Sequence, residues 1–255
     1  MAPAFFFMPA GGSPGIIWGM NTVRENAKAL FGVSLTAGQM QQMAVYEALL
    51  LEWNEKINLT AIRDVPGIRS KHFLDSLSCA LAFGGAAPRS LIDVGTGAGF
   101  PGLVLKIAYP EMRLTLVESV GKKTRFCELV ATELDLKDVT VLNARAEDVG
   151  RLPQHRQRYE WAVARAVARL PILLEYLLPL VRVGGHVLAQ KGETGPVEVM
   201  ESASALKVLG GSLRKVLPVA LPAVADERHL VLIDKTQATP NTYPRPAGVA
   251  SKKPL

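Results

Sequence analysis

The residues most able to do chemistry lie together in one short segment, DVGTGAGFPG at 93–102. Its alternate glycines, Gly95, Gly97 and Gly99, have no Cβ, so the backbone can turn tightly there and approach a ligand closely. The dinucleotide fingerprint has a different spacing, GxGxxG, with a helix N-terminus aimed at a pyrophosphate. The spacing GxGxG after the acidic Asp93 therefore indicates a nucleoside pocket without a phosphate site, or a tight turn that binds nothing.

Two acidic segments farther along the chain suit the same pocket. Glu118, with Ser119 beside it, follows Gly99 by about 20 residues, the separation at which an acidic side chain binds ribose hydroxyls in such folds. Ala146 and Glu147 form a second pair, in which the small side chain could flank an adenine and the carboxylate bond to it. Solvated carboxylates at strand ends are the alternative interpretation. A cofactor with a nucleoside, an amino-acid end and no phosphate is S-adenosylmethionine.

Short apolar runs alternate with helical patterns after about residue 90, which is typical of βαβ units and a doubly wound, mostly parallel sheet. Two final strands joined by a turn, the last antiparallel, would complete a seven-stranded sheet in an α/β, Rossmann-like fold. Helices are expected from Pro101, from Lys122, from Ile172 and over 197–209. The expected strands are LIDVG at 91–95, LTLVE at 114–118, VTVLNA at 139–144, WAVARA at 161–166, HVLAQK at 186–191, SLRKVLPVAL at 212–221 and DERHLVLIDK at 226–235.

Apolar residues recur at helical spacing from about residue 23 to 83, which predicts a helical extension before the sheet. Thr36 is a good N-cap for a helix over 40–54, and Pro66-Gly67 is expected to break the chain before a helix over 72–83. The predicted division is a disordered leader at 1–20, a helical cap at 21–85, a sheet-containing domain at 86–236 and an extended basic tail at 237–255.

Composition excludes several classes of protein. The chain has 255 residues, of which 49% are hydrophobic, a net charge of +6 and 2 cysteines. A chain of this length buries a sufficient core without disulfides or metal, and Cys79 and Cys127 lack the spacing of a zinc site. The most apolar stretch, 170–183, is too short and too often interrupted for a membrane span. We expect a cytoplasmic protein without metal or membrane contact, whose positive charge favours an anionic partner such as nucleic acid.

Eight segments complete the pattern in chain order: NLTAIRD at 58–64, KHFLDSL at 71–77, IDVGTGAGFPGL at 92–103, ESVGKKTRF at 118–126, ARAV at 164–167, QKG at 190–192, ERHLVLIDK at 227–235 and YPRPAGVASKKPL at 243–255. In this combination the chain resembles the bacterial glucose-inhibited division protein B family, which methylates N7 of a guanine in 16S ribosomal RNA, guanine 527 in the 530 loop. The resemblance implies a class I methyltransferase fold, S-adenosyl-L-methionine as cofactor, and 16S RNA or a small-subunit assembly particle as partner. We expect a monomer.

The resemblance also implies roles for particular residues. Gly95, Phe100, Glu118, the Ala146-Glu147 pair and Arg165 are the cofactor contacts that it transfers to this sequence. The glycine spacing and strand ends add Gly97, Gly99 and Ser119 to that set.

The acceptor atom determines what catalysis requires. Guanine N7 carries an in-plane lone pair and no proton, so it can attack a sulfonium methyl without a general base. The sequence has no Asn/Asp-Pro-Pro-Phe/Tyr segment for holding an exocyclic amine, and neither cysteine follows a proline. Positioning should therefore supply most of the rate, and Arg165, at the end of the fourth expected strand, is the residue expected to align the acceptor.

Basic residues near the cofactor edge and in the tail are candidates for RNA contact, although isolated charges often only solvate a surface. His72 and Asp75, three residues apart on one helix, could instead be a capping or packing pair. Removing 239–255 is expected to weaken RNA binding and to spare cofactor binding. The predicted RNA-binding residues are Lys71, His72, Lys122, Lys123, Arg125, Lys191, Arg245, Lys252 and Lys253.

Three other functions are compatible with parts of the sequence. A methyltransferase could act on another acceptor, a small molecule or a protein, although the basic tail argues against it. A binding module could keep the fold without activity, although the intact glycine loop, residues 95–102, together with Glu118 argues against such a loss of activity. A nicotinamide dehydrogenase fits less well, because the glycine spacing differs from the dinucleotide fingerprint.

Overall fold

The structure, a computed structural model, describes residues 19–255. The leader expected at 1–20 lies outside the described residues except for Gly19 and Met20. Met20 already begins the helix α1 (Met20–Phe31), so the expected leader is too long at its C-terminal end.

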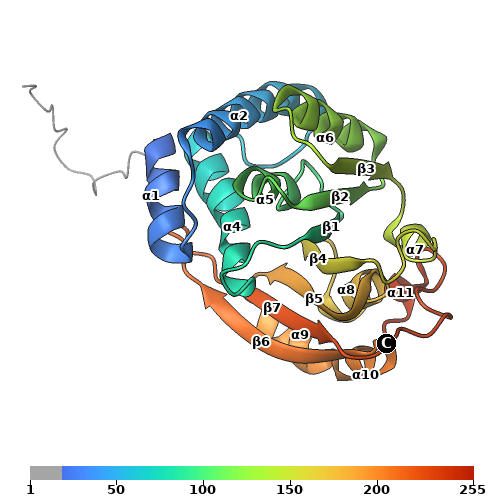
Figure 1. Cartoon of the computed structure of the whole chain (residues 1–255). Helices are drawn as coiled ribbons and strands as arrows, with labels where there is room; N and C mark the ends of the chain where they lie inside the picture. Colours follow the sequence, from blue (N-terminus) through green and yellow to red (C-terminus); the bar gives the residue numbers. More distant parts are fainter. Residues whose placement is uncertain (1–18) are drawn as a thin grey trace, which may run out of the picture.

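The centre of the molecule is one sheet of seven strands in the order β3-β2-β1-β4-β5-β7-β6 (Figure 1). The strands β1 to β5 pair in parallel, whereas β7 is antiparallel to both β5 and β6. This confirms the expected α/β class, the number of strands and the antiparallel last strand. The strands are β1 (Ser90–Val94), β2 (Arg113–Glu118), β3 (Val139–Asn143), β4 (Tyr159–Arg165), β5 (Val181–Lys191), β6 (Gly211–Val219) and β7 (Arg228–Lys235).

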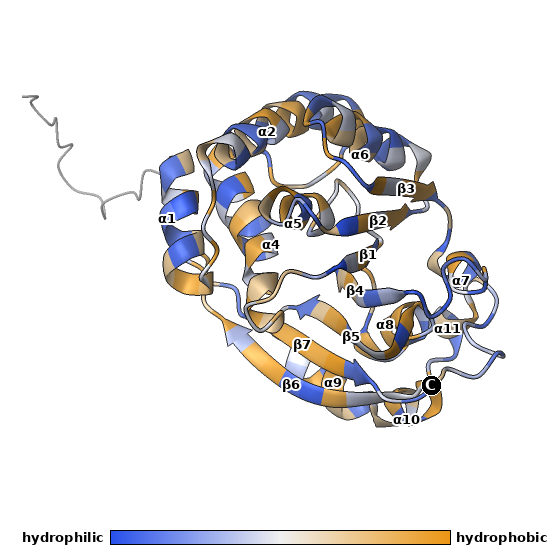
Figure 2. Ribbon diagram, viewed as in Figure 1, coloured by the Kyte–Doolittle hydropathy of each residue, from blue (hydrophilic) through white to orange (hydrophobic). Residues whose placement is uncertain are grey.

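Helices cover both faces of the sheet. Successive residues of a strand point to opposite faces, so the strands present apolar side chains on both sides, and the helices bury them. Leu91 and Val163 pack in one apolar cluster and Ile92 and Ala162 in the other, and Figure 2 shows hydrophobic residues on the strands and on the helices that flank them. The helix expected over 197–209 is two short helices that meet at Ser202. The helices after the cap are α5 (Gly102–Ala108), α6 (Gly121–Glu133), α7 (Ala146–Val149), α8 (Leu170–Leu177), α9 (Gly195–Glu201), α10 (Ala203–Leu209) and α11 (Val249–Lys252).

The N-terminal cap contains α1, the long helix α2 (Ala37–Ile57) and a further helical segment. Thr36 caps α2 as predicted: its hydroxyl accepts from the Gln39 backbone N–H, and the Gln39 side chain accepts from the Thr36 backbone N–H. The expected break at Pro66-Gly67 is wrong. Asp64 caps a helical turn there, and proline fits a first helical turn because no N–H is needed at that position.

The helical segment after Asp64 changes its geometry along its length. It runs through α3 (Val65–Gly67), a π-helical stretch η1 (Ile68–Leu74), α4 (Asp75–Leu77) and a 3₁₀ stretch η2 (Ser78–Ala82). A π-helical stretch inside a helix often lies at a functional site, since it redirects the side chains that it carries. Here it carries Lys71 and His72.

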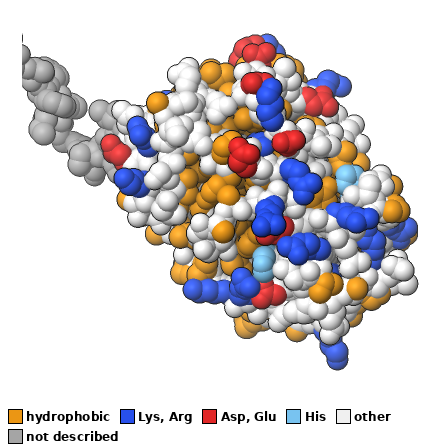
Figure 3. Space-filling view, in the orientation of Figure 1, with side chains coloured by type: hydrophobic (Ala, Val, Ile, Leu, Met, Phe, Trp, Pro, Cys, Tyr) orange, Lys and Arg blue, Asp and Glu red, His pale blue; other side chains and the backbone are white. Residues whose placement is uncertain are grey.

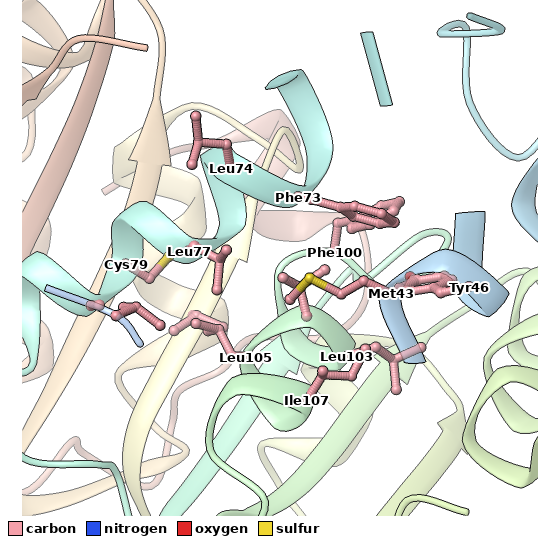
Figure 4. Packing of buried hydrophobic residues seen from close by; sticks show 14 of the residues in the cluster. Met43, Tyr46, Phe73, Leu74, Leu77, Cys79, Phe100, Leu103, Leu105 and Ile107 are labelled. Atoms are coloured by element: carbon pink, nitrogen blue, oxygen red, sulfur yellow. The ribbon is translucent and has the colours of Figure 1, made fainter. Parts of the chain in front are cut away.

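The cap packs directly onto the glycine loop. Figure 4 shows Tyr46 and Met43 of α2 beside Phe100 of the loop and Leu103 of α5. The Tyr46 ring stacks on Phe100 with centroids 5.3 Å apart, and its hydroxyl donates to the Ala98 carbonyl. The cap therefore holds the loop from the side opposite the sheet.

The tail is also part of the packed structure. The Arg156 guanidinium donates to the carbonyls of Thr239, Pro240 and Tyr243. Ala250 of α11 is 1% exposed within the apolar cluster that contains α8. The expectation of a wholly extended tail is thus wrong, because part of it is helical and docked.

Removing the Tyr46 hydroxyl tests the link between cap and loop. We expect Tyr46→Phe to lower the free energy of unfolding by about 1–3 kcal/mol, because the buried Ala98 carbonyl would lose its partner. Urea denaturation measures this change. Tyr109→Phe is a matched control, since the Tyr109 side chain is only partly buried and packs at the edge of the same cluster. An equal loss in both variants would contradict the proposed link.

Candidate functional site

A cavity of about 720 Å³ opens at the carboxyl edge of the sheet, between the cap and the loops that follow β1, β2, β4 and β5. A smaller hollow of about 230 Å³ lies between the loop after β3 and the tail. The two adjoin, because Gly95, Glu118, Ser119 and Val167 line both of them. Together they form a continuous binding space along the edge at which such folds take ligands.

The glycine loop needs glycine for two different reasons. Gly97 has φ of +61°, and no atom lies within 4 Å of the position that a Cβ would occupy, so the backbone there faces open space in the cavity. Gly99 has φ of +96°, and a Cβ there would lie 2.4 Å from Leu103 and 2.6 Å from the Tyr46 hydroxyl. At Gly99 the missing Cβ therefore leaves room for Leu103 of α5 and Tyr46 of the cap, and the cofactor contact expected from Gly99 stays a prediction.

Two carboxylates hold this loop in shape. Glu118, 7% exposed at the end of β2, accepts from the backbone N–H of Gly97 at 3.1 Å and of Val120 at 2.8 Å. Beneath the loop, Asp93 accepts from the Thr96 hydroxyl at 2.6 Å and the Gly102 N–H at 2.8 Å. Complete burial raises the pKa of Asp93 to about 7. The loop is therefore fixed before any ligand binds.

The smaller hollow has the expected adenine pair on its wall. Ala146 and Glu147 begin α7, and Tyr176 of α8 lines the hollow as well. Glu147 is 5% exposed and accepts from the Gly248 N–H at 3.1 Å. An open backbone at Gly97, a carboxylate at the end of β2 and this hollow suit a nucleoside with an amino-acid end.

Arg165 lies at the end of β4, where its guanidinium faces the cap. It donates to the Asp75 carboxylate at 2.7 Å, to the Lys71 carbonyl at 3.1 Å and to His72 Nδ1 at 3.1 Å. Its charge also lies over the Phe100 ring, 5.1 Å from the centroid. The cap thus fixes the one arginine that was expected to align the acceptor.

His72 is locked inside this cluster. Its ring stacks on Phe100 with centroids 4.4 Å apart, and its Nε2 lies 2.8 Å from the Thr60 hydroxyl. Because Nδ1 accepts from Arg165, the proton resides on Nε2 and is donated to Thr60. Burial, together with the Arg165 charge, lowers the pKa of His72 to about 3. A buried, neutral ring is unsuited to a phosphate contact, but His72 lines the cavity, and the RNA contact expected from it stays a prediction.

Two further cations predicted to contact RNA are paired with carboxylates of the protein itself. Lys191 Nζ lies 2.7 Å from Glu198 and donates to the Ala168 carbonyl, with its side chain 9% exposed. Arg245 forms a bidentate pair with Glu175, which is 1% exposed. A phosphate would have to compete with these buried carboxylates, which argues against both predicted phosphate contacts, although Lys191 lines the cavity.

The other predicted cations remain at or near the surface. Lys71 lines the cavity and pairs with Asp226 at 3.3 Å, and Lys123 lines it from the first turn of α6. Figure 3 shows Lys and Arg side chains spread over the middle and right of the face drawn. Lys122, Arg125, Lys252 and Lys253 are exposed.

The chain is similar in sequence to known proteins over most of its length. The sequence model of the family described as rRNA small subunit methyltransferase G matches residues 39–231. The methyltransferase G of Roseiflexus sp. (strain RS-1) is 53% identical over 92% of this chain and 100% of that protein. That of Alkaliphilus metalliredigens (strain QYMF) is 45% identical over 88% and 94%. This chain belongs to the rRNA small subunit methyltransferase G family.

The fold comparison points in the same direction. A SAM dependent methyltransferase from Aquifex aeolicus superposes with a TM-score of 0.53 and 17% identity, over 69% of this chain and 96% of that one. At that identity the likeness concerns the fold alone, and it agrees with the α/β, Rossmann-like fold expected from the strand pattern.

The sequence interpretation missed several residues at this methyltransferase's site. Thr60, Gln190 and Arg228 line the cavity. Gln190 donates to the Asp75 carbonyl at 2.8 Å, and its Oε1 has no partner within residues 19–255. All three lie in segments that carried the family resemblance, 58–64, 190–192 and 227–235, so the signal was present but did not specify a role.

Other kinds of site are not found in the part of the chain that the structure describes. No group of three or more His, Cys, Asp or Glu side chains is arranged to hold a metal ion. Nor does any helix between residues 19 and 255 have the length and apolar character to cross a membrane.

The buried neutral His72 should affect how stability depends on pH. Its pKa is about 3 in the folded enzyme and near 6.5 when unfolded, so acid favours the unfolded chain. His72 therefore leaves the free energy of unfolding unchanged above about pH 6.5 and lowers it progressively as the pH falls from there toward 3. We expect His72→Phe to flatten the decline in unfolding free energy between about pH 6.5 and 4, measured by urea denaturation.

The control for this prediction is Phe73→Leu, which weakens the same cluster without removing a titrating group. It should lower stability at every pH and keep the wild-type slope. A wild-type slope in His72→Phe would show that His72 does not titrate on unfolding as inferred.

Proposed function

We propose that this protein transfers the methyl group of S-adenosylmethionine to N7 of a guanine in 16S ribosomal RNA, guanine 527 in the 530 loop. Membership of the methyltransferase G family carries the proposal. The geometry supports it, because the open glycine loop and Glu118 adjoin a cavity large enough for a nucleotide base.

The cofactor would lie along the two adjoining hollows. Gly95, Gly97 and Phe100 would border its amino-acid end, with Glu118 and Ser119 at the ribose and Ala146 and Glu147 at the adenine. When bound, it supplies an electrophilic methyl group on a positively charged sulfur. The protein provides a rigid loop and shields the reacting centre from water.

No side chain of the cavity is poised as a general base. Asp75 is paired with Arg165, Glu198 with Lys191, and Glu118 accepts from backbone N–H groups. His72 is held neutral with Nδ1 occupied by Arg165. This suits guanine N7, which carries no proton to remove, so orientation of the acceptor is the main task of the protein.

Arg165 is proposed as the residue that orients the acceptor. Its guanidinium lines the cavity while Asp75, His72 and the Lys71 carbonyl fix its position. A planar donor held in this way can present an N–H to a base edge with little loss of side-chain entropy.

The RNA would reach the cavity across its basic rim. Contacts to phosphates position a nucleic acid, and each neutralised phosphate makes binding more sensitive to salt. We propose the exposed or partly exposed cations for this role, with the protein acting as a monomer in the cytoplasm on 16S RNA or an assembling small subunit. These cations are Lys71, Lys122, Lys123, Arg125, Lys252 and Lys253.

The deciding experiment maps modified bases in small-subunit RNA from a strain lacking this gene, with and without a plasmid copy. Loss of one N7-methylguanine, restored by the plasmid, supports the proposal. An unchanged map, with methyl transfer from the purified protein to another acceptor or to none, would contradict it.

Glu118 should control cofactor affinity. We expect Glu118→Ala to weaken binding of S-adenosylhomocysteine by about 1–3 kcal/mol, because the ribose and the Gly97 N–H would both lose an acceptor. Isothermal titration calorimetry measures this loss. Glu111→Ala is the control, since Glu111 is exposed beyond the other end of the strand. Normal cofactor affinity with impaired RNA binding would place Glu118 in the wrong site.

The reaction should show no titrating base. With cofactor and RNA saturating, the single-turnover rate should be nearly constant from about pH 6.5 to 8.5, without the bell shape of an acid–base pair. Asp93 has a pKa of about 7 but is buried beneath the loop. Its ionisation can change cofactor affinity, and saturation removes that effect.

Arg165→Ala should lower the saturated rate at every pH, whereas the loss in Glu118→Ala should largely recover at high cofactor concentration. A rate that rises steeply with pH, and loses that rise in a single variant, would show that a base exists and that the acceptor is not N7.

A further inference from the structure

The end of the tail lies against the smaller hollow, where the adenine is proposed to bind. Ser251 of α11 lines that hollow together with Tyr176 and Glu147. We infer that residues 248–255 form a wall of the cofactor site and position Glu147 within it. This inference rests on the proposed function and assigns the tail a role in cofactor affinity.

Two hydrogen bonds connect the tail to residues of the hollow. The Gly248 N–H donates to Glu147 Oε1 at 3.1 Å, and the Ser251 hydroxyl lies 3.2 Å from the Tyr176 hydroxyl. Gly248 has φ of +80°, a conformation that L side chains rarely adopt. With Oε1 held by the tail, the direction of the second carboxylate oxygen is fixed, which turns a side chain with free torsions into an oriented acceptor.

The tail can hold Glu147 because Arg245, three residues before Gly248, is firmly anchored. The Arg245 backbone N–H and guanidinium all donate to Glu175, at 2.6–3.1 Å. Arg245 also donates to the Lys253 carbonyl at 2.8 Å, so it links both ends of the segment that contains α11. Because Glu175 is 1% exposed, loss of Arg245 would leave a buried carboxylate without its cationic partner, which is costly.

Further contacts place the approach to this segment. Arg151 donates to the Pro244 carbonyl at 2.9 Å, and Pro244 packs against Gly150, where a Cβ would lie 2.9 Å from its ring. Gly150 directly follows α7, the helix that carries Glu147. The tail therefore contacts α7 at Glu147 and again just beyond its C-terminal end, at Gly150.

This arrangement reverses the expectation that removal of the tail spares cofactor binding. The exposed Lys252 lies beside Ser251 on the same short helix, and the exposed Lys253 follows directly after it. A change in the tail should consequently alter cofactor affinity in the complete absence of RNA, which a simple RNA-binding arm would not do.

The first test ends the chain after Ala247. This variant keeps the Arg245–Glu175 pair and the Arg156 contacts, so the fold should persist, as circular dichroism and thermal unfolding would verify. We expect the dissociation constant of S-adenosylhomocysteine, measured by calorimetry without RNA, to rise about tenfold or more. Thr242→Ala is the matched control, an exposed tail residue away from the hollow, and should bind like the wild type.

A second variant guards against unfolding of the shortened chain. Ser251→Trp keeps the whole tail and adds bulk at the wall of the hollow, so it should also weaken S-adenosylhomocysteine binding about tenfold. Normal affinity in a folded shortened chain or in Ser251→Trp would overturn the inference.

A double-mutant cycle tests the positioning of Glu147. If the tail acts through Glu147, then Glu147→Ala combined with the shortened tail should lose little more affinity than Glu147→Ala alone. Full additivity would overturn the positioning role. The proposed function fails separately: it would be contradicted if the wild-type protein itself did not bind S-adenosylhomocysteine.

Discussion

The structure depends on one constrained piece of backbone, the glycine loop between β1 and α5. Backbone N–H groups in such a turn need acceptors, and buried polar groups left without partners are costly. Asp93 meets this need from below, Glu118 from the neighbouring strand, and Tyr46 donates to the loop from the cap. Three segments far apart in the chain therefore converge on one loop, and this convergence fixes where the cap must sit relative to the sheet.

The charged groups around the cavity also need partners. Removing ions from water is expensive unless each finds a partner with good geometry. Arg165 with Asp75, and Lys191 with Glu198, meet that condition inside the site, and Arg245 with Glu175 meets it under the tail. These cations stabilise the site through their ion pairs. Recognition of an anionic partner is left to the exposed cations on the rim, whose contribution salt can screen.

The sequence predicted correctly those features that depend only on residues close together in the chain. The parallel strand pattern, the N-cap at Thr36 and the glycine loop each follow from side-chain periodicity or backbone freedom within a few residues. The failures have equally definite causes. Pro66 lies in the first turn of a helix because Asp64 caps it, and part of the tail is docked because Arg156 and Glu175 bind it.

The sequence alone therefore determined the α/β class, the order of the elements and the carboxyl edge of the sheet as the binding region. It also carried the family resemblance that the comparisons confirm. Only the tertiary structure decided which cations are free, since Lys191 and Arg245 differ from Lys122 and Lys252 in their partners and not in their type. It likewise decided that His72 is neutral and that the tail reaches Glu147. Burial and long-range pairing set these properties, and they arise between residues that are distant along the chain.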